Sequence, residues 1–156
     1  MAEPDLGENN LLLVEDDELD VIAIKRALRK ANIGNPLFHA SDGVEALAML
    51  RGESGPPIAR PYMILLDLNM PRMDGIEFLA EIRSDPDLKD SIVFMLTTSN
   101  DAKDISRAYE NMVAGYMVKS KAGEDFLNLV RMLDHYWHII EFPVSRPSSD
   151  SMRPIA

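Results

Sequence analysis

A stretch in the middle of the chain limits the possible folds more than any other. It consists of an unbroken apolar run, Tyr62 to Leu66, then Asp67, and then the turn-forming residues Pro71 and Asp74-Gly75. An apolar run of this length between turn signals is typical of a strand buried on both faces of a parallel sheet. We therefore expect Asp67 at the carboxyl end of a central strand, which is the edge where open α/β sheets bind their ligands.

Similar apolar runs alternate with segments of helical periodicity along the rest of the sequence. The runs that we expect to form strands cover residues 11–14, 36–40, 62–66, 92–96 and 115–118. The segments that favour helices cover residues 21–31, the stretches after Asp42 and Asp74, and residues 101–112 and 123–142. This alternation predicts a doubly wound, five-stranded parallel α/β sheet with helices on both faces. Right-handed crossovers then place all five strand ends on one edge of the sheet.

Composition narrows the class of protein. The chain has 156 residues, no cysteine and a formal net charge of −10 at pH 7. The length suits one domain, which we expect over residues 11–142, with a flexible segment over 1–10 and a loose tail over 143–156. The lack of cysteine excludes disulfides and thiolate metal sites, and the charge argues against a nucleic-acid surface. No apolar stretch reaches the roughly 20 residues of a membrane span, so we expect a soluble cytoplasmic protein.

Polar side chains follow four of the five expected strands. They are Glu15, Asp16 and Asp17 after the first strand, Asp67 and Asn69 after the third, Thr97, Thr98 and Ser99 after the fourth, and Lys119 after the fifth. Carboxylates gathered at one edge repel one another, and a hard cation such as Mg²⁺ relieves that repulsion. The cation, a lysine and a hydroxyl together surround a place for a phosphoryl group, and a carboxylate in line with that group can act as its nucleophile.

These residues stand in four short motifs. The motifs are Val14-Glu15-Asp16-Asp17, Leu66-Asp67-Leu68-Asn69-Met70-Pro71 with Asp74-Gly75, Leu96-Thr97-Thr98, and Tyr116-Met117-Val118-Lys119. Each motif alone is weak, but four in this order, each at an expected strand end, resemble the receiver domain of two-component response regulators. The resemblance covers residues 11–140 and implies a flavodoxin-like (βα)5 fold with the strand order 2-1-3-4-5.

The resemblance also implies a role for each residue at the sheet edge. Asp67 would accept a phosphoryl group from a phosphohistidine of a sensor histidine kinase, and Lys119 would pair with that group. Thr97 matches the switch hydroxyl, with Thr98 as the second choice, and Tyr116 matches the aromatic side chain whose rotamer reports the switch. The residues that would hold Mg²⁺ are Glu15, Asp16, Asp67 and, through its carbonyl, Asn69.

Position 120 departs from the family pattern. The lysine is usually followed by proline, often with a cis peptide bond, whereas here Ser120 follows Lys119. A cis bond before a residue other than proline costs about 3 kcal/mol. The bond is therefore either cis and strained, or trans with Lys119 placed differently.

A narrower resemblance is to small regulators that serve phytochrome kinases. It rests on the loop over residues 52–61, on Leu96-Thr97-Thr98-Ser99, on Lys119-Ser120, and on the terminal Tyr136-Trp137 and Phe142-Pro143. Those regulators consist of a receiver alone and pair through the fourth and fifth helices and the fifth strand. The resemblance implies a phytochrome, such as a bacterial phytochrome, as the kinase partner, and a homodimer.

Two of the expected helices carry apolar residues that have to be buried against the core or against a partner. The apolar residues of the last helix fill about half of its circumference, more than the ~100° stripe that one core needs, so one edge would face water without a partner. We expect a homodimer contact there, and the alternative is that the tail folds back over it. The residues expected at the contact are Tyr136, Trp137 and Ile140. In the helix over residues 101–112, those expected to point inward are Ile105, Ala108, Tyr109 and Met112.

Two other functions use the same residues. A haloacid-dehalogenase-like phosphatase also forms an aspartyl phosphate. That family has an Asp-x-Asp motif after the strand, whereas the second aspartate of the motif is replaced by Asn69 in this chain. A degenerate receiver binds partners without phosphorylation, but the intact Asp16, Asp67 and Lys119 argue against it. We therefore expect a signalling switch rather than an enzyme with a separate substrate. Its own chemistry would be Mg²⁺-dependent self-phosphorylation and autodephosphorylation, with output through protein contacts.

Overall fold

The computed structural model describes residues 9–121 and 126–143 of the chain. Its centre is a parallel sheet of five strands in the order β2-β1-β3-β4-β5, which confirms the predicted fold class. All residues of the central strand β3 are buried, as expected for a strand that is covered on both faces. The strands are β1 (Asn10–Val14), β2 (Leu37–Ala40), β3 (Tyr62–Leu66), β4 (Ile92–Thr97) and β5 (Gly115–Val118).

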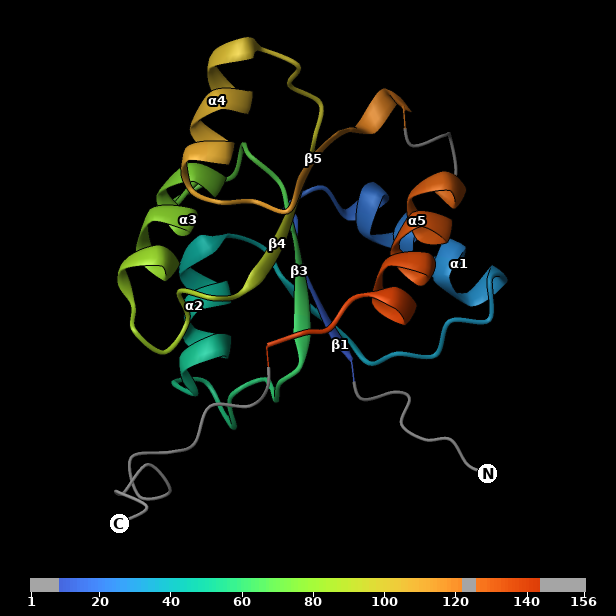
Figure 1. Cartoon of the computed structure of the whole chain (residues 1–156), viewed down its shortest axis with the longest axis horizontal. Coiled ribbons are helices and arrows are strands. Elements are labelled where there is room, and N and C mark those ends of the chain that lie inside the picture. Colours follow the sequence, from blue (N-terminus) through green and yellow to red (C-terminus); the bar gives the residue numbers. More distant parts are fainter. Residues whose placement is uncertain (1–8, 122–125, 144–156) are drawn as a thin grey trace.

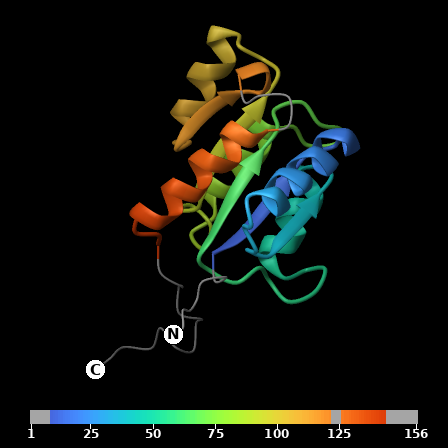
Figure 2. The ribbon, with the colours of Figure 1, turned by 90° about the vertical axis from the view of Figure 1, so that its right-hand side faces the viewer.

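Helices cover both faces of this sheet. They are α1 (Glu18–Lys30), α2 (Gly43–Arg51), α3 (Gly75–Ser84), α4 (Ala102–Glu110) and α5 (Leu127–Ile139), and a short 3₁₀ turn, Lys119–Lys121, follows β5. Figure 1 shows α2, α3 and α4 on one face of the sheet and α1 and α5 on the other. Figure 2, turned by 90°, shows α1 and α5 in front of the strands. None of the described helices is long and apolar enough to cross a membrane.

The two faces of the sheet carry two separate apolar cores. Side chains alternate between the faces along a strand, so Ile64 and Leu66 of β3 belong to the core under α2 and α3. Met63 and Leu65 belong to the core under α1 and α5. None of these four side chains is more than 1% exposed. Both faces of β3 therefore require apolar residues, which explains why its sequence is an unbroken apolar run.

The strand register brings the functional residues together. Val14 at the end of β1 pairs with Leu66 at the end of β3. The backbone N–H of Asp67 continues this pairing by donating to the carbonyl of Val14 at 2.9 Å. Since Glu15 and Asp67 each follow one of these paired residues, they leave the sheet side by side.

Aspartates start four of the helices in the described part of the chain. The side chains of Asp17, Asp42, Asp74 and Asp101 each accept a backbone N–H from the first turn of the helix that follows. At Asp74 the backbone N–H in turn donates to the side chain of Glu77, which completes a capping box. Such caps satisfy N–H groups that have no partner within the helix. They fix the residue at which the chain turns from a strand into a helix.

Arg83 joins the end of α3 to the end of α4. Its guanidinium donates to the carbonyl oxygens of Asn111 and Met112, just after α4, at 2.7 and 2.9 Å. It also donates to the carbonyl oxygens of Lys89 and Ser91, just before β4, at 2.7 and 2.9 Å. Carbonyls at a helix end lack N–H partners in the helix. Arg83 supplies those partners and holds the carboxyl end of α4 against the body of the domain.

The prediction for the fourth helix is partly wrong. Ala108 is buried as expected, but Tyr109 and Met112 are 50% and 65% exposed. Tyr109 follows Ala108 directly, and successive residues of an α-helix point about 100° apart. Met112 lies beyond the last helical residue and has a φ of 61°, so it does not continue the buried face.

The end of the chain also differs from the prediction. Helix α5 covers Leu127–Ile139 and ends before the predicted residue 142, because Ile140 takes an extended backbone conformation. The predicted start, residues 123–125, lies outside the described residues. The only cis peptide bond among the described residues is Arg60–Pro61, so the Lys119–Ser120 bond is trans. The segments predicted to be flexible, 1–10 and 143–156, lie outside the described residues except for residues 9, 10 and 143.

Candidate functional site

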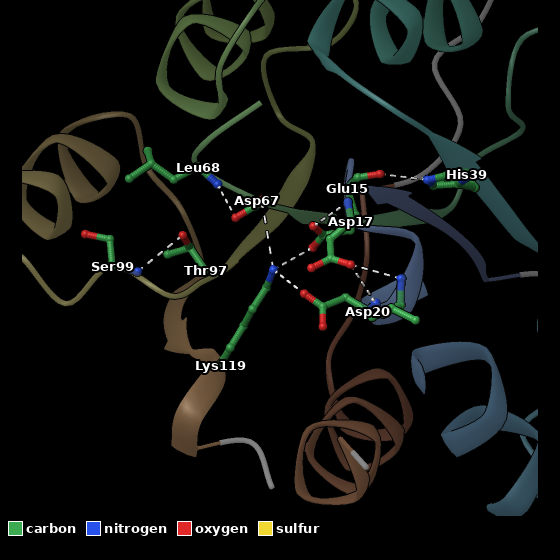
Figure 3. A network of polar contacts seen from close by, with 10 residues as sticks. Glu15, Asp17, Asp20, His39, Asp67, Leu68, Thr97, Ser99 and Lys119 are labelled. Carbon is green, nitrogen blue, oxygen red and sulfur yellow. Dashed lines mark hydrogen bonds and ion pairs between the residues drawn. The ribbon is translucent and has the colours of Figure 1, made fainter. Parts of the chain in front are cut away.

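The candidate site lies at the carboxyl edge of the sheet, beyond the ends of β1, β3, β4 and β5. Figure 3 shows Lys119 reaching from the end of β5 into the space between Glu15, Asp20 and Asp67. Glu15 and Asp67 follow the neighbouring strands β1 and β3, and Thr97 is the last residue of β4. The four strand ends that carry the predicted site residues therefore do converge.

Three carboxylates meet at this edge. Ligand oxygens of Glu15, Asp16 and Asp67 lie within 4.8 Å of one another. Glu15 and Asp67 are only 1% and 7% exposed, whereas Asp16 is open to solvent. A set of oxygen ligands with one side open to water fits a hard divalent cation. The structure thus groups three of the four residues predicted to hold a metal, and the fourth, Asn69, is exposed two residues beyond Asp67.

Burial raises the pKa of both buried acids, Glu15 and Asp67. It raises the pKa of Glu15 to about 7, and the charge of Asp67 adds to the rise while Lys119 opposes it. Burial also raises the pKa of Asp67, against the charge of Lys119 and hydrogen bonds from Thr97 and Leu68. Two buried carboxylates in this position resist being ionised together. A bound cation would offset the repulsion between the two ionised carboxylates.

Lys119 forms ion pairs with three carboxylates. Its Nζ lies 2.9 Å from Oε1 of Glu15, 2.6 Å from Oδ2 of Asp20 and 3.9 Å from Oδ2 of Asp67. The first two distances allow hydrogen bonds, and the third does not. Burial lowers the pKa of Lys119, but the hydrogen bonds to Asp20 and Glu15 outweigh it, so the pKa is raised and the lysine stays charged.

Asp20 is the residue of this site that the sequence prediction missed. It lies in the first turn of α1, three residues after the cap Asp17. Its place one helical turn beyond the acidic pair puts it on the side of α1 that faces the sheet edge, which is the signal that could have found it. Its partner, Lys119, is 99 positions away in the sequence. Only the fold shows that the two meet.

Thr97 and Tyr116 connect the site with the start of α4. Thr97 is fully buried, and its Oγ1 accepts a 3.4 Å hydrogen bond from the N–H of Ser99. The hydroxyl of Tyr116 donates to the carbonyl of Ser99 at 2.9 Å. The hydroxyl of Ser99 donates to Asp104 of α4 at 2.7 Å. A displacement of Thr97 would therefore reach α4 through Ser99, whereas Thr98 is exposed.

The backbone around Asp67 holds its carboxylate in place. Oδ1 accepts the N–H of Leu68 at 2.8 Å, which leaves Oδ2 facing Lys119. Gly75, the first residue of α3, packs directly on this backbone. A Cβ atom at Gly75 would press on the carbonyl oxygen of Asp67 and lie 2.9 Å from Cα of Leu68. Only glycine allows α3 to start this close to the strand end.

The residues predicted at a dimer contact differ in exposure. Trp137 is 8% exposed and belongs to the core between α5, α1 and the sheet, which corrects its assignment as a contact residue. Tyr136 is half-buried, with its ring at 4.9 Å and 86° to that of Phe94. Ile140 is 40% exposed, and the neighbouring Ile139 is 75% exposed. The exposed apolar surface of α5 therefore lies at its carboxyl end.

A buried aspartate after the central strand, beside an acidic pair and facing a lysine from the last strand, defines a receiver domain. A sequence model described as the response regulator receiver domain matches residues 11–131. The chain belongs to this family.

Individual relatives show which response regulators the chain resembles. Response regulator Rcp1 of Synechocystis sp. is 39% identical over 131 residues, which cover 81% of this chain and 87% of Rcp1. The crystal structure of Mn²⁺-bound Rcp1 matches with a TM-score of 0.76 and 35% identity, over 87% of this chain and 99% of that chain. The phosphorylated cyanobacterial phytochrome response regulator RcpA matches with a TM-score of 0.75 and 34% identity, over the same shares of 87% and 99%. These matches confirm the resemblance to phytochrome response regulators.

Proposed function

We propose that this chain is a phosphorylation switch in a phytochrome-linked two-component pathway. Asp67 takes a phosphoryl group from a phosphohistidine of the kinase. Its Oδ2 forms the new P–O bond while the P–N bond of the donor breaks, and the leaving imidazole nitrogen keeps the electron pair and takes a proton from solvent. The observation that carries the proposal is the buried Asp67 carboxylate, held at Oδ1 by Leu68 and facing Lys119 with Oδ2. Similarity to RcpA, a phytochrome response regulator, supports a phytochrome as the kinase.

We further propose Mg²⁺ as the cation of the site. Glu15, Asp16 and Asp67 would hold it, together with the carbonyl of Asn69. When bound, it would neutralise the negative charge that builds up between the carboxylates and the phosphoryl group. The oxygen ligand set and the raised pKa values of Glu15 and Asp67 support this choice.

Affinity for Mg²⁺ is expected to fall when the pH is lowered from 8 to 6. Burial raises the pKa of Glu15 to about 7, so this acid is ionised at pH 8 but carries a proton at pH 6 that the cation must displace. One such proton weakens binding by up to about tenfold for each pH unit below the pKa. Titration calorimetry in two buffers of different ionisation enthalpy measures both the affinity and the protons released. Equal affinity at both pH values, with no proton release, would contradict the prediction.

The output is proposed to pass through protein contacts of α4, β5 and α5. A phosphoryl group on Asp67 would attract the hydroxyl of Thr97 and the ammonium of Lys119. The hydrogen bonds that Ser99 donates to Thr97 and to Asp104 of α4, and the one that it accepts from Tyr116, support this route. The chain would act in the cytoplasm on no separate substrate, and its own chemistry would be limited to gaining and losing the phosphoryl group.

Phosphotransfer from purified kinases tests the proposal. A phytochrome kinase and a chemotaxis-type kinase are each loaded with labelled phosphate on histidine and mixed with the chain and Mg²⁺, and acetyl phosphate serves as a donor without a kinase. We expect faster transfer from the phytochrome kinase than from the other kinase. Label from acetyl phosphate but from neither kinase would contradict a phytochrome as the kinase partner. No label from any donor would refute phosphorylation itself.

We also propose that the chain pairs with a second copy through α4, β5 and α5. Strand β5 lies at the edge of the sheet. On α5, Ile139 is 75% exposed and lies on the same flank as Tyr136, whose ring contacts Phe94 of β4. Beside α4, Tyr109 and Met112 are 50% and 65% exposed. Apolar side chains thus flank the edge strand on both sides, which supports a contact between the same surfaces of two copies.

Ile139→Lys is expected to weaken the dimer by about tenfold, the scale of one well-placed interface residue. Leu19→Lys is the matched control, because Leu19 is 76% exposed in the first turn of α1, which is not part of the proposed α4, β5 and α5 surface. Sedimentation velocity over a range of concentrations, with and without acetyl phosphate and Mg²⁺, measures the dimer content. If both variants pair as the wild type does, the interface lies elsewhere.

A further inference from the structure

Asp20 holds Lys119 more closely than the acceptor does. Nζ of Lys119 lies 2.6 Å from Oδ2 of Asp20 but 3.9 Å from Oδ2 of Asp67. The side chains of Lys119 and Asp20 are 11% and 23% exposed, so water screens their attraction only in part. The lysine that is expected to meet the phosphoryl group is therefore turned toward α1 in this structure (Figure 3).

Asp20 has a fixed position because its helix is anchored. The carboxylate of Asp17 accepts the N–H of Asp20 at 3.4 Å in the cap of α1. Val21 and Ile24 of the same helix are 6% and 0% exposed and lie in the core. Lys119, in contrast, reaches the site through a long, flexible side chain from the turn after β5. A change of partner must therefore come from movement of the lysine.

The two possible partners compete for the same ammonium group. At 3.9 Å from Asp67, Lys119 is too far away for a hydrogen bond to that carboxylate. To donate to a phosphoryl group on Asp67, Nζ has to approach it, and the contact with Asp20 has to lengthen. Glu15 is less able to retain the lysine when its carboxylate holds a cation. Asp20 lies outside the three carboxylates that could ligate one and keeps its hold on Lys119.

We propose that Asp20 is a positioning residue that holds Lys119 against α1 in the unphosphorylated chain and competes with the phosphoryl group for its ammonium. The proposal rests on the proposed role of Asp67 as phosphoryl acceptor. Asp20 touches no reacting atom. It sets how readily the chain changes to its phosphorylated form, and loss of its carboxylate favours that form.

The test compares Asp20→Asn with Glu18→Gln. Glu18 lies in the same first turn of α1 and is exposed, so its variant removes the same charge without a contact to Lys119. Beryllofluoride with Mg²⁺ is the probe, since it forms a stable tetrahedral mimic of a phosphoryl group on a carboxylate. Fluorine NMR measures its affinity. We expect Asp20→Asn to bind the probe about 3- to 10-fold more tightly, the scale of one charge-assisted hydrogen bond traded for another, and Glu18→Gln to bind as the wild type does.

A second background separates positioning from a general charge effect. In Lys119→Met, the Asp20→Asn change should no longer alter probe affinity, whereas an effect of charge at the helix start would persist. A double-mutant cycle on urea unfolding, without metal or probe, should also show favourable coupling between Asp20 and Lys119. This second readout does not depend on phosphorylation.

The outcomes distinguish this inference from the proposed function. A wild-type chain that binds no probe overturns the role of Asp67 and the inference with it. A wild type that binds the probe, with an Asp20→Asn variant that binds equally or more weakly, overturns the inference alone. Persistence of the effect in Lys119→Met, or absence of coupling in the unfolding cycle, also overturns it.

Discussion

Asp67→Asn is expected to abolish the incorporation of phosphate from acetyl phosphate and Mg²⁺. The asparagine amide keeps the shape of the carboxylate but is not a nucleophile that forms an acyl phosphate. Intact-mass spectrometry measures the adduct. Asp87→Asn is the control, because Asp87 is exposed between α3 and β4 and undergoes the same chemical change away from the site. An adduct on Asp67→Asn at the wild-type rate would refute the assignment of the acceptor.

The stability of the same variant shows whether the loss is chemical. Burial raises the pKa of Asp67 above its unfolded value, so the folded chain favours the protonated acid. That contribution is full below the unfolded pKa and is lost as the pH rises through the folded pKa. Asparagine carries no charge to desolvate. At pH 8 and without metal, Asp67→Asn is therefore expected to melt at the same temperature as the wild type or higher, and a large drop in melting temperature would point to misfolding instead.

Gly75→Ala is expected to impair both folding and phosphorylation. The added methyl group would press on the carbonyl oxygen of Asp67 and on Cα of Leu68, and backbone atoms cannot rotate aside as a side chain can. Overpacking of this kind costs about 1–3 kcal/mol. Any relief moves either the start of α3 or the strand end that carries the acceptor. We expect incorporation from acetyl phosphate to fall by at least about tenfold, since small misplacements of a reacting group have large effects on rate.

The control for this variant is Gly34→Ala. Nothing lies within 4 Å of the place where a Cβ atom would stand at Gly34, so stability and incorporation should both stay near the wild-type values. Urea denaturation and the rate of adduct formation are measured on both variants. If Gly75→Ala matches Gly34→Ala in both measurements, the close packing of α3 on Asp67 has no functional importance.

Much of this fold could be predicted because its local signals agree. The run before Asp67 has to be apolar on both faces, and Asp74 both ends the turn and caps α3. The position of Asp67 at the sheet edge follows from these features alone. The strand order could be predicted only from the family resemblance, because apolar runs indicate where strands are but not which strands pair in the sheet.

Other features could not be predicted because they depend on tertiary contacts. The apolar face of α5 is wide, and its width does not show which part faces α1 and which part faces solvent. The structure places Trp137 in the core and leaves Ile139 exposed. Asp20 looked like an ordinary acidic residue in the first turn of a helix, where the helix dipole favours it. Its contact with Lys119 joins the first helix to the turn after the last strand.

The clamp formed by Arg83 has a consequence for how a signal can leave the domain. The carboxyl end of α4 is bound through the carbonyls of Asn111 and Met112, whereas its amino end is linked to the site through Ser99 and Asp104. A helix that is fixed at one end and pulled at the other pivots rather than slides. For the proposed switch, we therefore expect the largest displacement in the first turn of α4, with the turn after Glu110 as the hinge.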